Sequence, residues 1–183
     1  MGTIKSILVN ESMRSAGDTY SARECMLCNE YPQLYFDGCS KGNPGRAGAG
    51  AVIYKNKNDQ TPSGELNARI KFVGINETNN VAEYTGLIIG LQDAVKLNIK
   101  NIVVNGDSLL VIKQMQGIYQ VKSPSLKALY QEAKTLEKHF DTISYNHVYR
   151  INNKRADALA NDALANDVLA NDTLANDTLA NAH

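Results

Sequence analysis

The stretch LYFDGCSKGNPGRAGAGAVIY, residues 34–54, is the part of the sequence that most clearly indicates the fold. Its two ends, Leu34–Phe36 and Ala49–Tyr54, carry the apolar and aromatic residues that are typical of β-strands. The Gly and Pro residues between them indicate a turn, so we expect an antiparallel hairpin. Asp37 directly follows the first apolar run, which predicts a carboxylate at the end of the first strand.

The rest of the middle region alternates between strand and helix patterns. A third strand is expected over Glu65–Val73, and apolar spacing predicts a helix over Thr78–Leu97. Further elements are predicted in this order: a strand ending at Asp107, a helix that begins with Leu109–Met115, a helix opening at Ser123–Pro124, a strand over Ile143–Tyr149 and a helix beginning at Ala156–Leu159. This order indicates an α/β fold with a mixed sheet.

Composition divides the 183 residues into three segments. Residues 33–160 carry 16 Lys and Arg against 11 Asp and Glu, a net charge of +5 that is compatible with a polyanionic partner. Residues 1–32 have a net charge of −1 and residues 161–183 one of −4. We therefore expect one domain over 33–160, with an N-terminal extension and a C-terminal tail.

Four carboxylates stand where they can meet. Asp37 and Asp107 follow strands, while Glu83 and Asp157 lie near helix starts, and such positions gather at one edge of an α/β sheet. Like charges gathered there repel one another, and Mg²⁺, which prefers oxygen ligands, resolves that repulsion. Taken singly, each acid also fits a solvated helix cap or a favourable charge on the helix dipole.

Four sequence blocks, DGCSKGNPG, TNNVAEYTGLIIGL, VNGDSLLVIKQM and HVYRINNKRADALA, resemble the motifs of type 1 ribonuclease H, in that family's order. The resemblance implies an α/β ribonuclease H-like fold with a five-stranded mixed sheet whose first three strands are antiparallel. It implies hydrolysis of the RNA strand of RNA/DNA hybrids with two Mg²⁺ ions, or Mn²⁺, leaving 5′-phosphate and 3′-hydroxyl ends. Carried over by position, the metal-binding acids are Asp37, Glu83, Asp107 and Asp157.

The same resemblance places Asn43, Asn79 and Asn80 against the hybrid. Arg150 and Lys154 are candidates for phosphate contacts, and plain surface charge is the alternative for both. We expect the glycines after Asp37, Gly38 included, to let backbone N–H groups approach a sugar–phosphate chain. Other hypotheses are a binding module of the same fold with weak catalysis, and a domain detached from a reverse transcriptase.

Two features depart from well-studied relatives. Only QGIYQVKSPS lies between Met115 and Leu126, so the Lys- and Trp-rich protrusion is absent, and residues 1–32 lack the pattern of a hybrid-binding domain. His147 resembles the short-loop version of the family, in which this residue sits on the last strand in a structural or substrate-edge role. The alternative is the His that many relatives carry on a flexible loop before the last acid, where it assists product departure. Cys25 and Cys28 have zinc-like spacing, but a free pair is favoured over a four-ligand zinc site.

The tail repeats five residues, with Leu at 159, 164, 169, 174 and 179. A five-residue step turns a helix by about 140°, so the Leu residues form no stripe, and we expect the helix to end near Asn161 and fray beyond it. An odd Cys count without an export signal favours a reducing intracellular compartment, cytoplasm or nucleus. We expect no membrane partner, because the loose myristoylation pattern at Gly2 is disfavoured. We also expect a monomer.

Overall fold

The computed structural model describes residues 29–180, with side chains to residue 167. Its main elements are β1 (Gln33–Lys41), β2 (Gly45–Tyr54), β3 (Glu65–Glu77), α2 (Asn79–Lys96), β4 (Asn101–Gly106), α3 (Leu109–Met115), α4 (Pro124–Glu137), β5 (Thr142–His147) and α5 (Lys154–Ala180), with short 3₁₀ turns η1 (Pro62–Gly64) and η2 (Arg150–Asn152).

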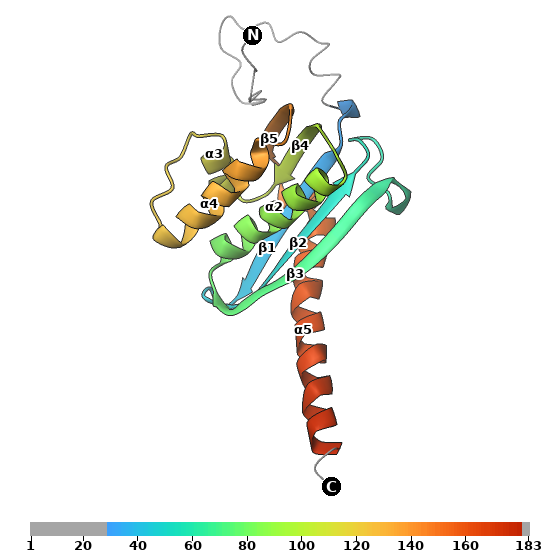
Figure 1. Ribbon diagram of the computed structural model, residues 1–183, viewed down its shortest axis with the longest axis vertical. Helices are drawn as coiled ribbons and strands as arrows, with labels where there is room; N and C mark the ends of the chain where they lie inside the picture. The colour runs from blue at the N-terminus through green and yellow to red at the C-terminus, as the bar shows by residue number, and fades with distance from the viewer. Residues whose placement is uncertain (1–28, 181–183) are drawn as a thin grey trace, which may run out of the picture.

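The five strands form one sheet in the order β3-β2-β1-β4-β5. β1, β2 and β3 are antiparallel neighbours, whereas β4 runs parallel to β1 and β5 runs parallel to β4. The five-stranded mixed sheet with three antiparallel strands is therefore confirmed. Because β4 and β5 are parallel to β1, each needs a helical crossover, and α2, α3 and α4 supply them (Figure 1).

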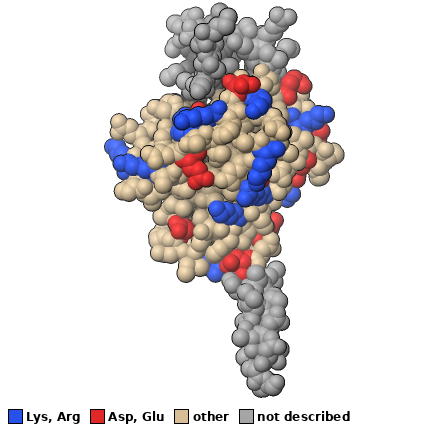
Figure 2. Space-filling model, viewed as in Figure 1, with Lys and Arg blue, Asp and Glu red and all other residues tan. Residues whose placement is uncertain are grey.

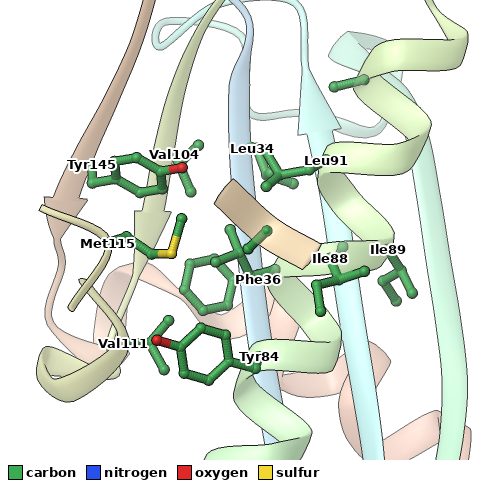
Figure 3. Packing of buried hydrophobic residues seen from close by; sticks show 14 of the residues in the cluster. Leu34, Phe36, Tyr84, Ile88, Ile89, Leu91, Val104, Val111, Met115 and Tyr145 are labelled. Carbon is green, nitrogen blue, oxygen red and sulfur yellow. The ribbon is translucent and has the colours of Figure 1, made fainter. Parts of the chain in front are cut away.

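The two faces of the sheet are covered unequally. The larger core lies between the sheet and α2, α3 and α4, where Phe36, Tyr84 and Met115 point toward one another (Figure 3). The opposite face carries α5, whose Ala156 and Leu159 pack against side chains of β1 and β2. Each fully buried large apolar side chain contributes roughly 1.5–3 kcal/mol, so the α2 side holds most of the stability.

The glycine-rich stretch is strand rather than loop, which corrects the prediction that Asp37 ends the first strand. Only Gly42–Pro44 form the turn, and Asp37 pairs with Gly50 in the middle of β1. The physical reason is close packing: a Cβ at Gly50 would lie 2.5 Å from the Ala160 nitrogen of α5. The glycines thus let helices approach the sheet, and glycine content alone did not separate that use from a loop.

Asp37 nevertheless lies at an end of one strand pairing. The parallel pairing of β1 with β4 stops at Phe36 and Gly106, so Asp37 and Asp107 are the next residues on two strands that part at that point. The two carboxylates are therefore neighbours in space although 70 residues separate them. This parting of β1 and β4 positions the candidate site.

The last helix is longer than predicted, since α5 continues to Ala180 instead of ending near Asn161, and it extends beyond the sheet (Figure 1). Ala163 and Leu164 are buried, and Arg46 of β2 pairs with Asp167. The prediction considered the Leu residues only, whereas the repeat is also rich in Ala. The buried residues of α5 follow one another at helical spacing and form an apolar stripe as far as Leu164: Ala156, Leu159, Ala160, Ala163 and Leu164.

Basic and acidic side chains are interspersed over the face that carries α2 and α4 (Figure 2). Among residues 29–180 no helix is long and apolar enough to cross a membrane. The predictions for Gly2, Cys25 and Cys28, and most of the expected N-terminal extension, lie outside the described residues. Within them, Cys39 on β1 is a free cysteine.

Candidate active site

Three of the four predicted acids converge where β1 and β4 part. Asp37 comes from β1, Glu83 from the second turn of α2, and Asp107 directly follows β4. One carboxylate oxygen from each of these residues lies within 4.8 Å of the others, and both Asp37 and Glu83 are buried. Three carboxylates at this separation form a compact site of high negative charge when all are ionised.

Asp37 is the centre of this cluster. Its side chain accepts a hydrogen bond at 2.8 Å from the Gly38 N–H, which favours the ionised form. Burial and then the charge of Asp107 outweigh that bond and raise the pKa of Asp37 from 3.8 to about 7, with a smaller contribution from Asp157. The protein therefore holds this carboxylate in a position where its charge is costly unless a cation neutralises it.

Glu83 is held in a similar environment. It is 5% exposed, and burial followed by the charges of Asp37 and Asp107 raises its pKa well above the usual value. One oxygen lies 3.5 Å from the Asn79 amide, while the other, Oε2, is buried without a hydrogen-bond partner. A buried carboxylate oxygen without a partner is expensive, and a bound cation would satisfy it.

The Asp107 carboxylate is fixed by a residue from another part of the chain. Its Oδ1 accepts a hydrogen bond at 2.8 Å from the side-chain amide of Asn153, which immediately precedes α5. Its backbone carbonyl lies 3.2 Å from Nε2 of His147, at the end of β5. The expected position of His147 on the last strand is thus observed, and its ring also contacts Tyr149 edge-on.

Asp157 lies beside the cluster rather than within the three-carboxylate group. It occupies the first turn of α5, and its Oδ1 accepts a hydrogen bond from the Arg150 guanidinium. Its charge still reaches Asp37, where it helps to raise the pKa. The exposed Arg150 side chain therefore lies at the rim of the site, paired with one predicted metal ligand.

The predicted substrate residues lie around the start of α2. Asn43, in the turn after β1, accepts a hydrogen bond at 2.9 Å from the Asn79 N–H, and Asn79 in turn accepts one at 3.2 Å from the Ser40 N–H. These contacts tie the turn to the helix that carries Glu83. Asn80 is partly exposed beside them, and Lys154 is exposed at the start of α5.

Gly38 has a packing role that the sequence did not reveal. A Cβ there would lie 2.1 Å from the Glu83 nitrogen, so only glycine lets α2 approach β1 at this point. Ser40 and Asn153, whose contacts hold the site together, were not predicted from the sequence. Asn153 directly precedes the observed α5, which begins at Lys154, whereas the helix was predicted to begin at Ala156, so its place before the helix gave no signal in the sequence.

The donor set fits a hard divalent cation. All the groups that converge are carboxylates, which Mg²⁺ and Mn²⁺ accept, and no His or Cys belongs to the three-residue group found among the described residues. The unpartnered oxygen of Glu83 and the raised pKa of Asp37 both indicate a site built around positive charge. Asp37, Glu83 and Asp107 would hold such an ion, with Asp157 beside them.

Comparison with known proteins places this geometry in a family. Residues 35–163 match the family described as Reverse transcriptase-like. The chain is 47% identical over 125 residues to the bifunctional protein Rv2228c of Mycobacterium tuberculosis, covering 68% of this chain and 33% of that protein. It is 41% identical over 127 residues to ribonuclease HI of Halobacterium salinarum, covering 69% of this chain and 61% of the relative.

Solved structures of ribonucleases H also resemble this chain. The N-terminal RNase H domain of Rv2228c, solved as a fusion protein, has a TM-score of 0.70 at 44% identity, covering 76% of this chain and 97% of that chain. LC11-RNase H1 in complex with RNA/DNA hybrid has a TM-score of 0.66 at 34% identity, covering 75% and 99%. The chain thus spans a third of the whole mycobacterial protein but almost all of its solved N-terminal domain.

Proposed function

Because the chain belongs to the type 1 ribonucleases H within the reverse transcriptase-like family, we propose that it is a metal-dependent endonuclease that cleaves the RNA strand of RNA/DNA hybrids. The observation that carries the proposal is the meeting of Asp37, Glu83 and Asp107 within 4.8 Å. Phosphodiester hydrolysis needs positive charge at the attacking and leaving oxygens, and a carboxylate cluster is the usual means of holding it.

The proposed roles follow from where each acid lies. Asp37, at the centre of the cluster, would hold two Mg²⁺ ions together with Glu83, Asp107 and Asp157. Mn²⁺ would serve in place of Mg²⁺. When bound, such ions would supply an activated water and stabilise the leaving oxygen, and we propose 5′-phosphate and 3′-hydroxyl product ends. The protein's own part is to keep the four carboxylates at fixed separations.

Hybrid recognition is proposed for the surface around the cluster. The LC11 enzyme, a structural neighbour, was solved with an RNA/DNA hybrid, which supports this substrate class. Asn43, Asn79 and Asn80 would face the sugar–phosphate chain, while Arg150 and Lys154 would contact phosphates; Gly38, whose N–H donates to Asp37, is buried against α2 instead. Selection of a hybrid over other duplexes would rest on groove shape and on 2′-hydroxyl groups.

The test is cleavage of end-labelled RNA/DNA, RNA/RNA and DNA/DNA duplexes with Mg²⁺, Mn²⁺ or EDTA, together with analysis of the product ends. We expect the RNA of the hybrid alone to be cut, and only with metal. Asp107→Asn should abolish cleavage, whereas Asp141→Asn, at the exposed opposite end of β5, is the matched control. Hybrid binding without cleavage by the wild-type protein would instead favour the binding-module hypothesis.

A further inference from the structure

Asn153 contacts two of the four candidate ligands, Asp107 and Asp157, and the residue that precedes a third, Asp37, without being a ligand itself. Its side-chain amide nitrogen donates to the carbonyl oxygen of Phe36 at 2.9 Å and to Oδ1 of Asp107 at 2.8 Å. Its own carbonyl oxygen accepts a hydrogen bond at 3.0 Å from the N–H of Asp157. The Phe36 carbonyl belongs to the peptide bond that leads into Asp37, so Asn153 bridges β1, β4 and α5.

The residue is too buried to be a surface cap. Asn153 is 1% exposed, and its side-chain oxygen is buried without a hydrogen-bond partner. An Asn before a helix usually turns its oxygen toward helix N–H groups. Here the amide N–H₂ faces two acceptors instead, an arrangement that a carboxylate or an apolar side chain cannot supply.

These hydrogen bonds lie where β1 and β4 part, next to the candidate ligands. Phe36 and Gly106 are the last residues at which β1 pairs with β4, so the strands part where Asp37 and Asp107 follow. The Asn153 side chain lies where the two strands part. Its hydrogen bond to Oδ1 of Asp107 restricts rotation of that carboxylate. The Asp157 N–H bond ties the first turn of α5 to the same residue.

We propose that Asn153 is a positioning residue, which sets the orientation of Asp107 and its spacing from Asp37 and Asp157 and thereby the affinity of the site for divalent cations. This inference rests on the proposed function, because it assumes that the carboxylates bind metal. Hydrogen-bond partners of metal ligands typically change metal affinity by about 10–100-fold when removed. The same loss is expected here.

The experiment is calorimetric titration of the full chain with Mn²⁺ in the absence of nucleic acid. The variants are Asn153→Ala, which removes the amide, and Asn153→Ser, which keeps a polar group too short to make both bonds. Asn152→Ala, the exposed neighbour in η2, is the matched control. Thermal melts in EDTA show that each variant is folded before its Mn²⁺ affinity is compared.

We expect Asn153→Ala and Asn153→Ser to bind Mn²⁺ about tenfold or more weakly, with Asn152→Ala unchanged. Hybrid cleavage by the Asn153 variants should recover as Mn²⁺ is raised, since the defect is one of affinity. If Asn153→Ala does not fold, the Ser variant decides. A folded Asn153 variant with an affinity within about twofold of wild type would overturn the inference, and so would failure of both variants to fold.

The same titration separates this inference from the proposed function. If the wild-type protein itself binds no Mn²⁺, the metal site is wrong and the proposed function fails with it. If the wild type binds Mn²⁺ and Asn153→Ala binds it equally well, only the positioning role of Asn153 is refuted.

Discussion

Replacing Asp37 with Asn should make the metal-free protein more stable at alkaline pH while removing its activity. The Asp37 side chain is 4% exposed and lies beside Asp107, Glu83 and Asp157. Asn has nearly the same size and shape but carries no charge. The substitution therefore removes like-charge repulsion and the burial of a charge, with little change in packing.

The size of the effect follows from the pKa of Asp37, which rises from 3.8 to about 7 on folding. A difference of one pKa unit corresponds to about 1.4 kcal/mol, so the full shift corresponds to roughly 4 kcal/mol. Because the neighbouring acids share and relax part of this repulsion, we expect Asp37→Asn to raise the free energy of unfolding by about 2–4 kcal/mol at pH 8.

The pH dependence has a definite sign. Between pH 3.8 and about 7 the folded protein holds a proton on Asp37 that the unfolded chain releases. Raising the pH through this window therefore destabilises the wild-type fold, and above it the loss is complete. The advantage of Asp37→Asn should be full at pH 8 and should shrink toward pH 5, where the wild-type carboxyl is largely protonated.

Urea unfolding in EDTA at pH 5, 6, 7 and 8 measures this directly for wild type, Asp37→Asn and the exposed control Asp141→Asn. Added Mg²⁺ should narrow the difference at pH 8, because it binds and stabilises the wild-type site preferentially. Equal stability of wild type and Asp37→Asn at pH 8, or an advantage that does not vary with pH, would refute the electrostatic account of the site.

Three further outcomes are expected. Asp107→Asn should lower single-turnover hybrid cleavage by several orders of magnitude and Asp157→Asn by less, since water can replace a ligand at the edge of the site; near-normal cleavage by a folded Asp107→Asn protein would contradict the two-metal assignment. Arg150→Ala should weaken hybrid binding measured in Ca²⁺ and reduce its salt slope by about one, and an unchanged slope would exclude a phosphate contact. Deleting residues 168–183 should leave activity and the melting temperature unchanged, because the packing seen among the described side chains, which end at residue 167, includes Leu164 and the Arg46–Asp167 pair and lies before this segment. A loss of activity or a lower melting temperature would show that the tail takes part.

Periodic elements were predictable from the sequence alone. The helix predicted over Thr78–Leu97 is observed as Asn79–Lys96, with the Thr78 side chain accepting a hydrogen bond from the Val81 N–H. The helix predicted to begin with Leu109–Met115 is observed over those residues. Both carry enough apolar residues at helical spacing to define a buried face. The strand before Asp107 was likewise a short apolar run with a clear end.

Packing between distant segments was not predictable in the same way. Asn153 and Phe36 are 117 residues apart, and nothing in either local sequence indicates that one donates to the other. The extent of α5 was missed because the buried Ala163 depends on the surface that β2 offers, not on the repeat itself. The pairing of Arg150 with Asp157 likewise depends on where η2 places the guanidinium.

Glycines in the glycine-rich stretch connect the predicted motif with the packing that was not predicted. The closeness of the carboxylates depends on how near the helices come to the sheet, and glycines allow that approach. A Cβ at Gly38 would lie 2.1 Å from the Glu83 nitrogen, and one at Gly86 would lie 2.5 Å from the Asp37 carbonyl oxygen. Glycine on both β1 and α2 therefore lets the two backbones touch beside the two acids. On the other face, Gly50 pairs with Asp37 and gives α5 the same close approach. Since Glu83 and Asp157 have short reach from helix backbones, this backbone contact is what brings helix-borne carboxylates to a strand-borne one.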